Sequence, residues 1–243
     1  MHVVVAGQGY VGLPLAVRAA EVGHRVVGYD VDPHRVQQLA AGESYVEHVA
    51  SARLRAVLDS GAYSATAEAA ALPRFDIAAD PAAGRSSRPD LRRVVRPDAR
   101  RALVPRCTVV LESTTYPGTT EELVIPILEK ASGLIAGADF HVGFSPERID
   151  PGNQTWPFEK TPKVVSGIDA ASLDVIKGFY DSVVQTTVPV SGTKVAELTK
   201  LIENTFRHVN IALVNEMAML ARPLGVNAGE AIDAAASKPG PRP

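Results

Sequence analysis

The sequence predicts an α/β fold with a Rossmann-like doubly wound parallel sheet, and three observations carry this prediction. Short apolar runs alternate with helical patterns along most of the chain. The first apolar run, residues 3–6, leads directly into a Gly-x-Gly-x-x-Gly loop at residues 7–12. An acidic residue, Asp30, ends the next run 23 residues after Gly7. A strand, a glycine loop, a helix and a distal acid in this order are typical of a dinucleotide-binding unit.

The residues of the glycine loop have different physical tasks. Gly7 allows the tight turn out of the strand, and Gly9 leaves the backbone open to a pyrophosphate. Gly12 lets the following helix pack closely against the strand. Tyr10 and Val11 lie at the start of this helix, whose free N–H groups and partial positive charge attract phosphates.

Asp30 indicates which dinucleotide would bind. Its carboxylate can accept hydrogen bonds from a ribose diol and would repel a 2′-phosphate, so we predict NAD rather than NADP. Arg35 follows on the next helix, near the adenosine end of such a ligand, although a solvated surface charge explains it equally well. The alternative for the whole motif is a glycine-rich turn that binds nothing.

The other elements continue the alternation. We expect further strands at residues 25–29, 109–111, 140–144, 164–167 and 187–190, while residues 75–79 begin like a strand and then lose the pattern. We expect helices at residues 13–22, 33–41, 49–58, 121–130, 170–180, 193–221 and 228–236. Asp32 suits the cap of the second helix, and Thr119 or Thr120 the cap of the fourth. Pro223 ends the long helix.

Composition and charge exclude several classes of protein. The chain has 243 residues and a net charge of −2, which gives no broad basic field for nucleic acid. No apolar run approaches membrane-spanning length. The single cysteine, Cys107, allows no internal disulfide, and no cluster of metal ligands is present in the sequence. We therefore expect a cytoplasmic protein without a signal peptide, a metal site, or nucleic-acid or membrane partners.

The segment at residues 78–106 departs from this pattern. Between residues 80 and 106 it contains eight arginines and four prolines, without helical periodicity or strand-like alternation. It could be a basic anion- or nucleic-acid-binding loop, but no aromatic residues interleave the arginines. A mobile, poorly packed segment is the favoured interpretation.

Polar residues follow two of the predicted strands, at the edge where parallel sheets bind ligands. Ser113 and Thr114 follow one strand, and Glu147 and Arg148 follow the next. The hydroxyl groups could equally serve as helix caps, and a Glu–Arg pair on a loop is often only a solvated ion pair.

The long helix carries a polar stripe. Lys200, Asn204 and His208 recur every four residues and therefore share one face. A solvated face explains this stripe as well as a site does.

Four motifs together resemble the UDP-glucose/GDP-mannose dehydrogenase family, the NAD-dependent nucleotide-sugar 6-dehydrogenases. They are the glycine loop with Tyr29 and Asp30, Glu-Ser-Thr-Thr-Tyr-Pro-Gly-Thr-Thr at 112–120, Ser-Pro-Glu-Arg at 145–148, and residues 196–204. The second and third motifs are most similar to the branch that acts on UDP-N-acetylhexosamines. The resemblance covers about residues 1–77 and 107–239.

The resemblance implies roles for the polar residues. NAD would lie on the glycine loop, with Asp30 and Arg35 at the adenosine end and Ser113 and Thr114 also in contact. Thr114 would help to hold a catalytic water, and Glu147 would serve a thioester-hydrolysing step. Lys200 would stabilise a developing oxyanion, and Asn204 would orient the substrate or the water. The implied reaction converts a UDP-sugar (a UDP-hexose or a UDP-N-acetylhexosamine) to a UDP-uronic acid by two hydride transfers.

The resemblance also implies an organisation into domains. Residues 1–190 would form the NAD-binding domain, and residues 191–243 would begin a central helical domain whose helix at 193–221 forms a homodimer interface. The family's nucleophile is a cysteine in a Gly-Gly-His-Cys loop just beyond the last residue here, and a C-terminal UDP-sugar-binding domain follows it. Cys107 precedes a strand and is expected at the opposite end of the sheet. We therefore expect a truncated member of a polysaccharide-biosynthesis family with little activity alone.

Other interpretations remain open. One is a non-catalytic remnant that keeps the NAD site or the dimer surface. Another, ranked last, is a 3-hydroxyacid or 6-phosphogluconate type of dehydrogenase, which would need an all-helical second domain for which 243 residues leave too little chain. In the segment at residues 78–106, the family has a strand, a loop and a helix. Here an arginine- and proline-rich sequence of similar length stands in their place, which suggests a shifted reading frame.

Overall fold

The structure is a computed structural model that describes residues 1–72, 74–80, 103–149 and 155–238. The chain divides into two compact units, Met1–Lys200 and Leu201–Pro243. Most of the arginine-rich segment, residues 81–102, lies outside the described residues, so the three hypotheses about it (a basic binding loop, a mobile segment and a shifted reading frame) stay untested.

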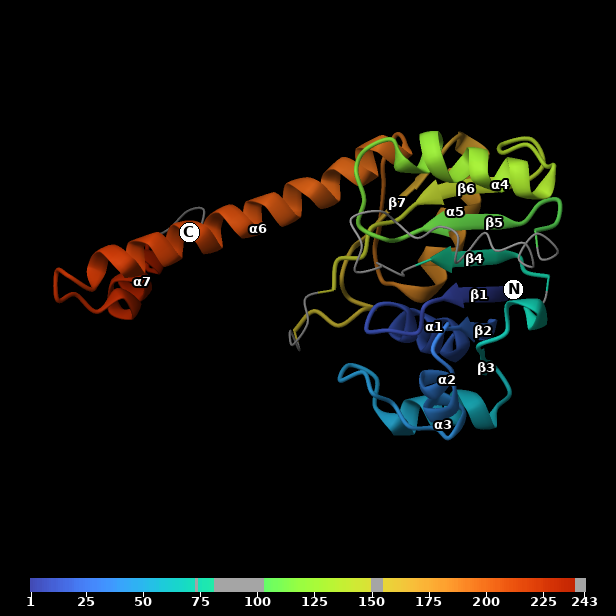
Figure 1. Ribbon diagram of the computed structural model, residues 1–243, viewed down its shortest axis with the longest axis horizontal. Coiled ribbons are helices and arrows are strands. Elements are labelled where there is room, and N and C mark those ends of the chain that lie inside the picture. The colour runs from blue at the N-terminus through green and yellow to red at the C-terminus, as the bar shows by residue number, and fades with distance from the viewer. Residues whose placement is uncertain (73, 81–102, 150–154, 239–243) are drawn as a thin grey trace. The chain divides into compact units, whose positions relative to one another are not determined.

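The first unit is built on a twisted sheet with the strand order β3-β2-β1-β4-β5-β6-β7-β8 within its described residues. Figure 1 shows β2, β1, β4 and β5 side by side at the middle of this sheet. The strands are β1 (His2–Ala6), β2 (Arg25–Tyr29), β3 (Tyr63–Thr66), β4 (Ile77–Asp80), β5 (Thr108–Leu111), β6 (His141–Phe144), β7 (Lys163–Gly167) and β8 (Thr187–Pro189).

Helices cover both faces of the sheet, as the doubly wound prediction requires. The helices of the first unit are α1 (Gly12–Glu21), α2 (Pro33–Ala40), α3 (Ser51–Asp59), α4 (Ile125–Ser132), α5 (Ala170–Val183) and the start of α6 (Thr193–Ala221). Residues of α1, α2, α3 and α5 share one apolar cluster, whereas α4 belongs to a second cluster. Asp32 caps α2 as predicted, because its Oδ1 accepts a hydrogen bond of 2.9 Å from the backbone N–H of His34.

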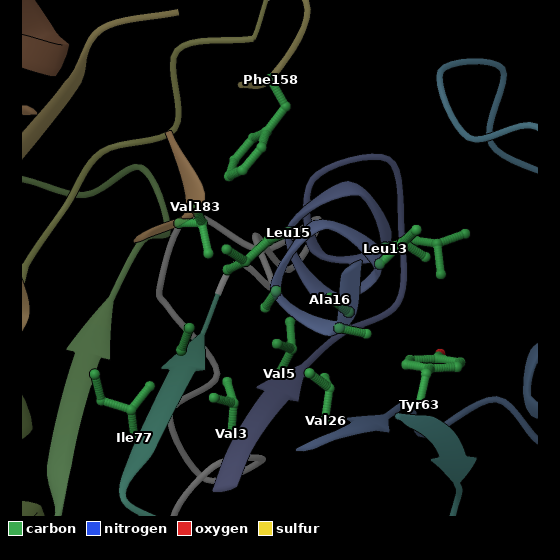
Figure 2. Close-up of a cluster of buried hydrophobic side chains, with 14 of the residues drawn as sticks. Val3, Val5, Leu13, Leu15, Ala16, Val26, Tyr63, Ile77, Phe158 and Val183 are labelled. Carbon is green, nitrogen blue, oxygen red and sulfur yellow. The ribbon is translucent and has the colours of Figure 1, made fainter. Parts of the chain in front are cut away.

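Alternation along β1 explains how one strand serves both clusters. Val3 and Val5 belong to the cluster that includes α1, and Val4 belongs to the cluster that includes α4. Side chains of a strand point alternately to its two faces, so an uninterrupted run of valines can be buried on both. Figure 2 shows Val3 and Val5 beneath Leu15 of α1.

Two features of the sheet differ from the prediction. The run at residues 75–79, which we expected to lose the strand pattern, leads into a strand, because β4 (Ile77–Asp80) pairs with both β1 and β5 at the centre of the sheet. β3 was not predicted, since Tyr63–Thr66 has no apolar run, yet it pairs with β2 at the sheet edge.

Two neighbouring strands, β7 and β8, also run in the opposite direction to the others. β7 pairs antiparallel with β6, whereas the other described pairings are parallel. A parallel neighbour needs a long crossover connection, usually a helix. The described residues between β6 and β7, 145–149 and 155–162, contain no helix, so the chain turns back along the sheet instead.

The second unit contains the rest of α6 and the short helix α7 (Ala228–Ala236). The bounds of both helices agree with the sequence prediction, and the chain leaves α6 at Ala221, two residues before Pro223. None of the residues 201–238 is buried. Many are large and apolar and lie exposed, among them Ile202, Phe206, Val209, Leu213, Met217 and Leu220.

No helix among the described residues is both long enough and apolar enough to cross a bilayer. No group of three or more potential metal ligands is found among them either.

Candidate functional site

The glycine loop between β1 and α1 has the geometry of an open turn. Gly7 adopts a φ of 93°, which favours glycine, and its N–H donates to the carbonyl of Tyr29 over 2.6 Å. A Cβ added at Gly9 would meet no atom within 4 Å, so a ligand can approach the backbone there. Gly12 is buried at the first position of α1. The backbone at Gly9 is therefore open, and binding of a pyrophosphate there stays a prediction.

The start of α1 offers backbone donors to such a ligand. Val11 occupies the cap position, and its apolar side chain makes no capping hydrogen bond. Tyr10 is exposed beside it. The first N–H groups of an α-helix have no partner within the helix, so an anion placed at this terminus gains both hydrogen bonds and the helix dipole.

Asp30 is directed towards the loop. It is only 4% exposed, and its Oδ2 accepts a hydrogen bond of 2.8 Å from the backbone N–H of Gln8. Its Oδ1 accepts another, of 3.0 Å, from the N–H of Asp32. Both carboxylate oxygens are thus oriented by the backbone before any ligand arrives.

Arg35 lies next to this carboxylate. Its Nη1 is 3.5 Å from Asp30 Oδ2, and its Nε is 3.8 Å from Asp32 Oδ2. The guanidinium lies over the ring of Tyr45, 5.7 Å from the centroid, and burial, with the nearby Asp30 charge, raises the pKa of Tyr45 to about 12. The structure therefore brings Arg35 to the acidic end of the site, although its side chain stays about half exposed.

The second polar group lies at the carboxyl end of β5. Ser113 is buried there, and Thr114 is exposed. The loop that follows is fixed by Glu197 of α6, whose carboxylate accepts hydrogen bonds from the N–H groups of Gly118 (2.6 Å) and Thr120 (2.8 Å).

This arrangement corrects the predicted helix cap. Thr119 occupies the cap position of a π-helical turn at Thr120–Val124 that leads into α4, but its side chain makes no capping bond. Its hydroxyl donates to the carbonyl of Tyr116 instead, over 2.7 Å. The hydroxyl of Thr120 donates to Glu197 Oε1, also over 2.7 Å. The carboxylate of Glu197, distant in sequence, thus accepts the backbone hydrogen bond at this helix start that we assigned to a local threonine side chain.

Glu147 lies beyond β6 in a cluster of buried charges. Lys163 Nζ is 2.9 Å from Glu147 Oε2 and 3.1 Å from Glu112 Oε1. The hydroxyl of Tyr180 donates to the same oxygen of Glu112 over 2.5 Å. Sequence reasoning missed Glu112, Lys163 and Tyr180 as members of a site, because they come from three separate segments: the end of β5, β7 and α5. The alternative of a solvated Glu147–Arg148 ion pair does not fit this geometry.

The charges of this cluster are unbalanced. Two carboxylates share one ammonium, and Oε2 of Glu112 is buried without a hydrogen-bond partner. Burial raises the pKa of Glu112. Burial opposes the charge on Lys163, but the two carboxylates outweigh it and raise the pKa of Lys163. The carboxylates thus favour the charged form of Lys163, while burial makes the charged form of Glu112 costly.

Lys200 meets this cluster from α6. Its Nζ donates a hydrogen bond to the backbone carbonyl of Glu147. Glu147 Oε1 also accepts from the N–H groups of Arg148 and Ile149, at 2.7 and 2.6 Å. The structure therefore brings together Glu147 and Lys200, two of the predicted catalytic residues. Asn204 belongs to the second unit, and its role stays a prediction.

Comparison with known proteins assigns these motifs to one protein family. Residues 1–184 match the NAD binding domain of the UDP-glucose/GDP-mannose dehydrogenase family, and residues 194–242 match the central domain of that family. The chain is 40% identical over 241 residues to Protein CapL of Staphylococcus aureus. It is 35% identical to a UDP-N-acetyl-D-mannosamine dehydrogenase of Pyrococcus horikoshii and to a UDP-N-acetyl-D-glucosamine 6-dehydrogenase of Pseudomonas aeruginosa.

Solved structures agree with this result. A UDP-D-ManNAc dehydrogenase from Pyrococcus horikoshii superposes with a TM-score of 0.89 and 33% identity, and the match covers 100% of this chain and 59% of that one. A GDP-mannose dehydrogenase from Pseudomonas aeruginosa, solved as a ternary complex, gives a TM-score of 0.86 at 26% identity, over 98% of this chain and 57% of that one. The three relatives by sequence are matched over 98% of this chain but only 56–58% of their own lengths.

Proposed function

Because the chain belongs to the UDP-glucose/GDP-mannose dehydrogenase family, we propose that it carries the cofactor-binding part of a UDP-sugar 6-dehydrogenase. NAD is the cofactor of the domain that residues 1–184 match. The observation that carries the proposal is the pairing of an open backbone at Gly9 with a buried Asp30 whose carboxylate faces the same loop. Ser113 and Thr114 would complete the cofactor contacts.

The proposed substrate is a UDP-N-acetylhexosamine. The names of two relatives, a UDP-N-acetyl-D-mannosamine dehydrogenase and a UDP-N-acetyl-D-glucosamine 6-dehydrogenase, support this class. NAD, when bound, supplies the acceptor for hydride from the alcohol carbon of the sugar. Polysaccharide biosynthesis in the cytoplasm is the proposed setting.

The chain's own residues would act around the reacting carbon. The Lys200 ammonium would stabilise negative charge as it develops on the substrate oxygen, because a fixed cation is most effective where charge appears in the transition state. Thr114, exposed at the end of β5, would hold a water molecule. Glu147 would serve a later hydrolytic step, and Asn204 would orient the substrate or the water.

Cys107 favours a second candidate function, a chain that binds NAD without turnover. It is the only cysteine of the sequence, is 1% exposed, and directly precedes β5. It thus lies at the amino end of the strand, whereas Thr114 follows the carboxyl end. Burial raises the pKa of its thiol, which makes it a poor nucleophile. We therefore propose little or no oxidation of a UDP-sugar to the acid by this chain alone.

The exposed apolar residues of α6 support a homodimer as part of the proposal. Large contiguous apolar surface on a helix marks a site of association. Sedimentation of the purified chain tests this point, and a monomer at all concentrations would contradict it.

Calorimetric titration with NAD, followed by an assay for NADH with UDP-N-acetylglucosamine and UDP-N-acetylmannosamine, tests the function. We expect binding of NAD and little NADH. Absence of any NAD binding would overturn the cofactor assignment. Sustained NADH production would overturn the second candidate and show that the chain is active without a cysteine at the carboxyl edge of the sheet.

A further inference from the structure

We infer that Gln8 and Tyr63 are positioning residues that hold Asp30 in the orientation required by the ribose of the dinucleotide. The inference rests on the proposed binding of NAD at the glycine loop. It extends that proposal to two residues that serve the site through Asp30.

Gln8 occupies the first position of the Gly-x-Gly-x-x-Gly loop that the motif leaves open, and its side chain is completely buried. Its Nε2 donates to the carbonyl of Val5 over 2.8 Å, and its Oε1 accepts a hydrogen bond from the hydroxyl of Tyr63, also over 2.8 Å. A buried amide is tolerated only when its groups are paired, and here both ends are. The side chain therefore fixes the loop to β1 and β3 at once.

The backbone of Gln8 connects this buried side chain to Asp30. Its N–H donates to Asp30 Oδ2 over 2.8 Å, and its carbonyl accepts from the hydroxyl of Tyr45 over 2.5 Å. Any displacement of the Gln8 side chain would move the N–H group that aims the Asp30 carboxylate. We refer to the Gln8 side chain and the Tyr63 hydroxyl together as the Gln8–Tyr63 brace.

Gly28 shows that the neighbouring strand accommodates this brace. A Cβ added at Gly28 would lie 2.5 Å from Cδ of Gln8 and 2.6 Å from the hydroxyl oxygen of Tyr63. Gly28 lies in β2, two residues before Asp30, where a β-branched residue would otherwise suit the strand. The space that its missing side chain leaves is filled by the two polar groups of the brace (Figure 2 shows Tyr63 at the edge of the apolar cluster).

The consequence is preorganisation of the carboxylate. A ribose diol presents two hydroxyls in a fixed geometry, so the affinity depends on how little Asp30 must be ordered on binding. The same charge repels a 2′-phosphate, so a well-held Asp30 also sets the preference for NAD over NADP. A loosened Asp30 should weaken NAD binding and narrow that preference together.

The test measures the dissociation constants of NAD and NADP for the whole chain and for Tyr63→Phe. Removal of the hydroxyl leaves Gln8 Oε1 buried without a donor. We expect NAD affinity to fall by about five- to tenfold and the ratio of NADP to NAD dissociation constants to fall by about threefold. General destabilisation would lower both affinities alike and leave this ratio unchanged.

Matched variants separate the brace from other effects. Tyr29→Phe deletes a hydroxyl from a buried tyrosine of β2 that takes no part in the brace, and it should leave the ratio unchanged. In an Asp30→Asn background, Tyr63→Phe should no longer change the ratio, because the brace acts through the charge of Asp30. Gly28→Ala, which displaces the brace by contact, provides a second test if Tyr63→Phe does not fold.

The outcomes are distinguishable. Failure of the unaltered chain to bind NAD overturns the proposed function and this inference with it. Tyr63→Phe decides the inference, and Gly28→Ala decides it only where Tyr63→Phe does not fold. Binding of NAD with an unchanged ratio in the deciding variant overturns the inference alone. A lower ratio in that variant that disappears in the Asp30→Asn background supports it.

Discussion

Two acidic sites at the carboxyl edge of the sheet differ in whether a buried cation holds them. At the first, Asp30 accepts hydrogen bonds from backbone N–H groups, and a half-exposed arginine lies beside it. At the second, Glu147 and Glu112 share the ammonium of Lys163 within the protein.

The difference follows from how the sites are assembled. The first site comes from residues close in sequence and stays open beside Gly9. The second is a closed charge network in which Glu112 and Tyr180 are 68 residues apart. Backbone donors can orient a carboxylate for a ligand, whereas a buried lysine mainly neutralises it.

The largest expected effect is the loss of the buried cation. Lys163→Met would leave the buried Glu112 and the largely buried Glu147 without the cation that they share, and we expect a loss of about 3–5 kcal/mol in the free energy of unfolding. Urea unfolding followed by circular dichroism measures it. The matched control is Lys177→Met, which breaks the exposed pair with Asp181 and should cost less than about 0.5 kcal/mol. Similar losses in both variants would show that the cluster is not the closed network described above.

The link between α6 and the loop after β5 should give a smaller effect. Glu197→Gln replaces an acceptor of three hydrogen bonds by a group with one oxygen, so the donors of Gly118 and Thr120 compete for it. We expect a loss of about 1–3 kcal/mol in the free energy of unfolding. Glu43→Gln, at an exposed position, is the control and should be neutral. Equal stability of the two variants would mean that Glu197 does not anchor the loop.

A substitution at the open site, Asp30, should change the affinity for dinucleotides rather than the free energy of unfolding. Asp30→Asn keeps an acceptor for the N–H of Gln8 but removes the charge, and we expect NAD affinity to fall by about tenfold, which corresponds to about 1.4 kcal/mol. NADP affinity should fall less or rise, because Arg35 is released from its acidic partner. Calorimetric titration with NAD and with NADP measures both affinities. Asp59→Asn serves as the remote control, and an equal loss for both ligands would contradict the role of the charge.

The smallest expected effect is a difference in pH dependence. Burial raises the folded-state pKa of Glu112, so its contribution to stability is present at low pH and is lost as the pH rises above the unfolded value near 4.5. The variant Glu112→Gln should therefore gain stability relative to the unaltered chain between about pH 4.5 and pH 7. Urea midpoints across this range measure the change.

A surface carboxylate, Glu21, should show a pH dependence of stability opposite to that of Glu112. The hydrogen bond from Arg53 lowers the pKa of Glu21, so its contribution is present above pH 4.5 and is lost as the pH falls. Glu21→Gln should therefore lose stability relative to the unaltered chain as the pH rises through this region. Parallel curves for the two variants would contradict the contrast between a buried and an exposed carboxylate.

Patterns within some thirty residues of sequence determined much of this protein. The glycine loop, the cap at Asp32 and the bounds of α6 and α7 were predicted correctly, because turn chemistry, capping and helical periodicity act between near neighbours. Asp30 was predicted to serve this loop, and its carboxylate faces it.

Only the tertiary structure decided the rest. The antiparallel direction of β7, the pairing of β3, and the replacement of a threonine cap by Glu197 depend on which segments meet in space. Two further examples are the Glu112–Lys163–Tyr180 cluster and the Gln8–Tyr63 brace. Each contains a hydrogen bond between residues that lie 55 or more positions apart in the sequence. Buried polar groups must find partners wherever packing places them, and a linear sequence does not show which distant donor will lie within hydrogen-bonding distance.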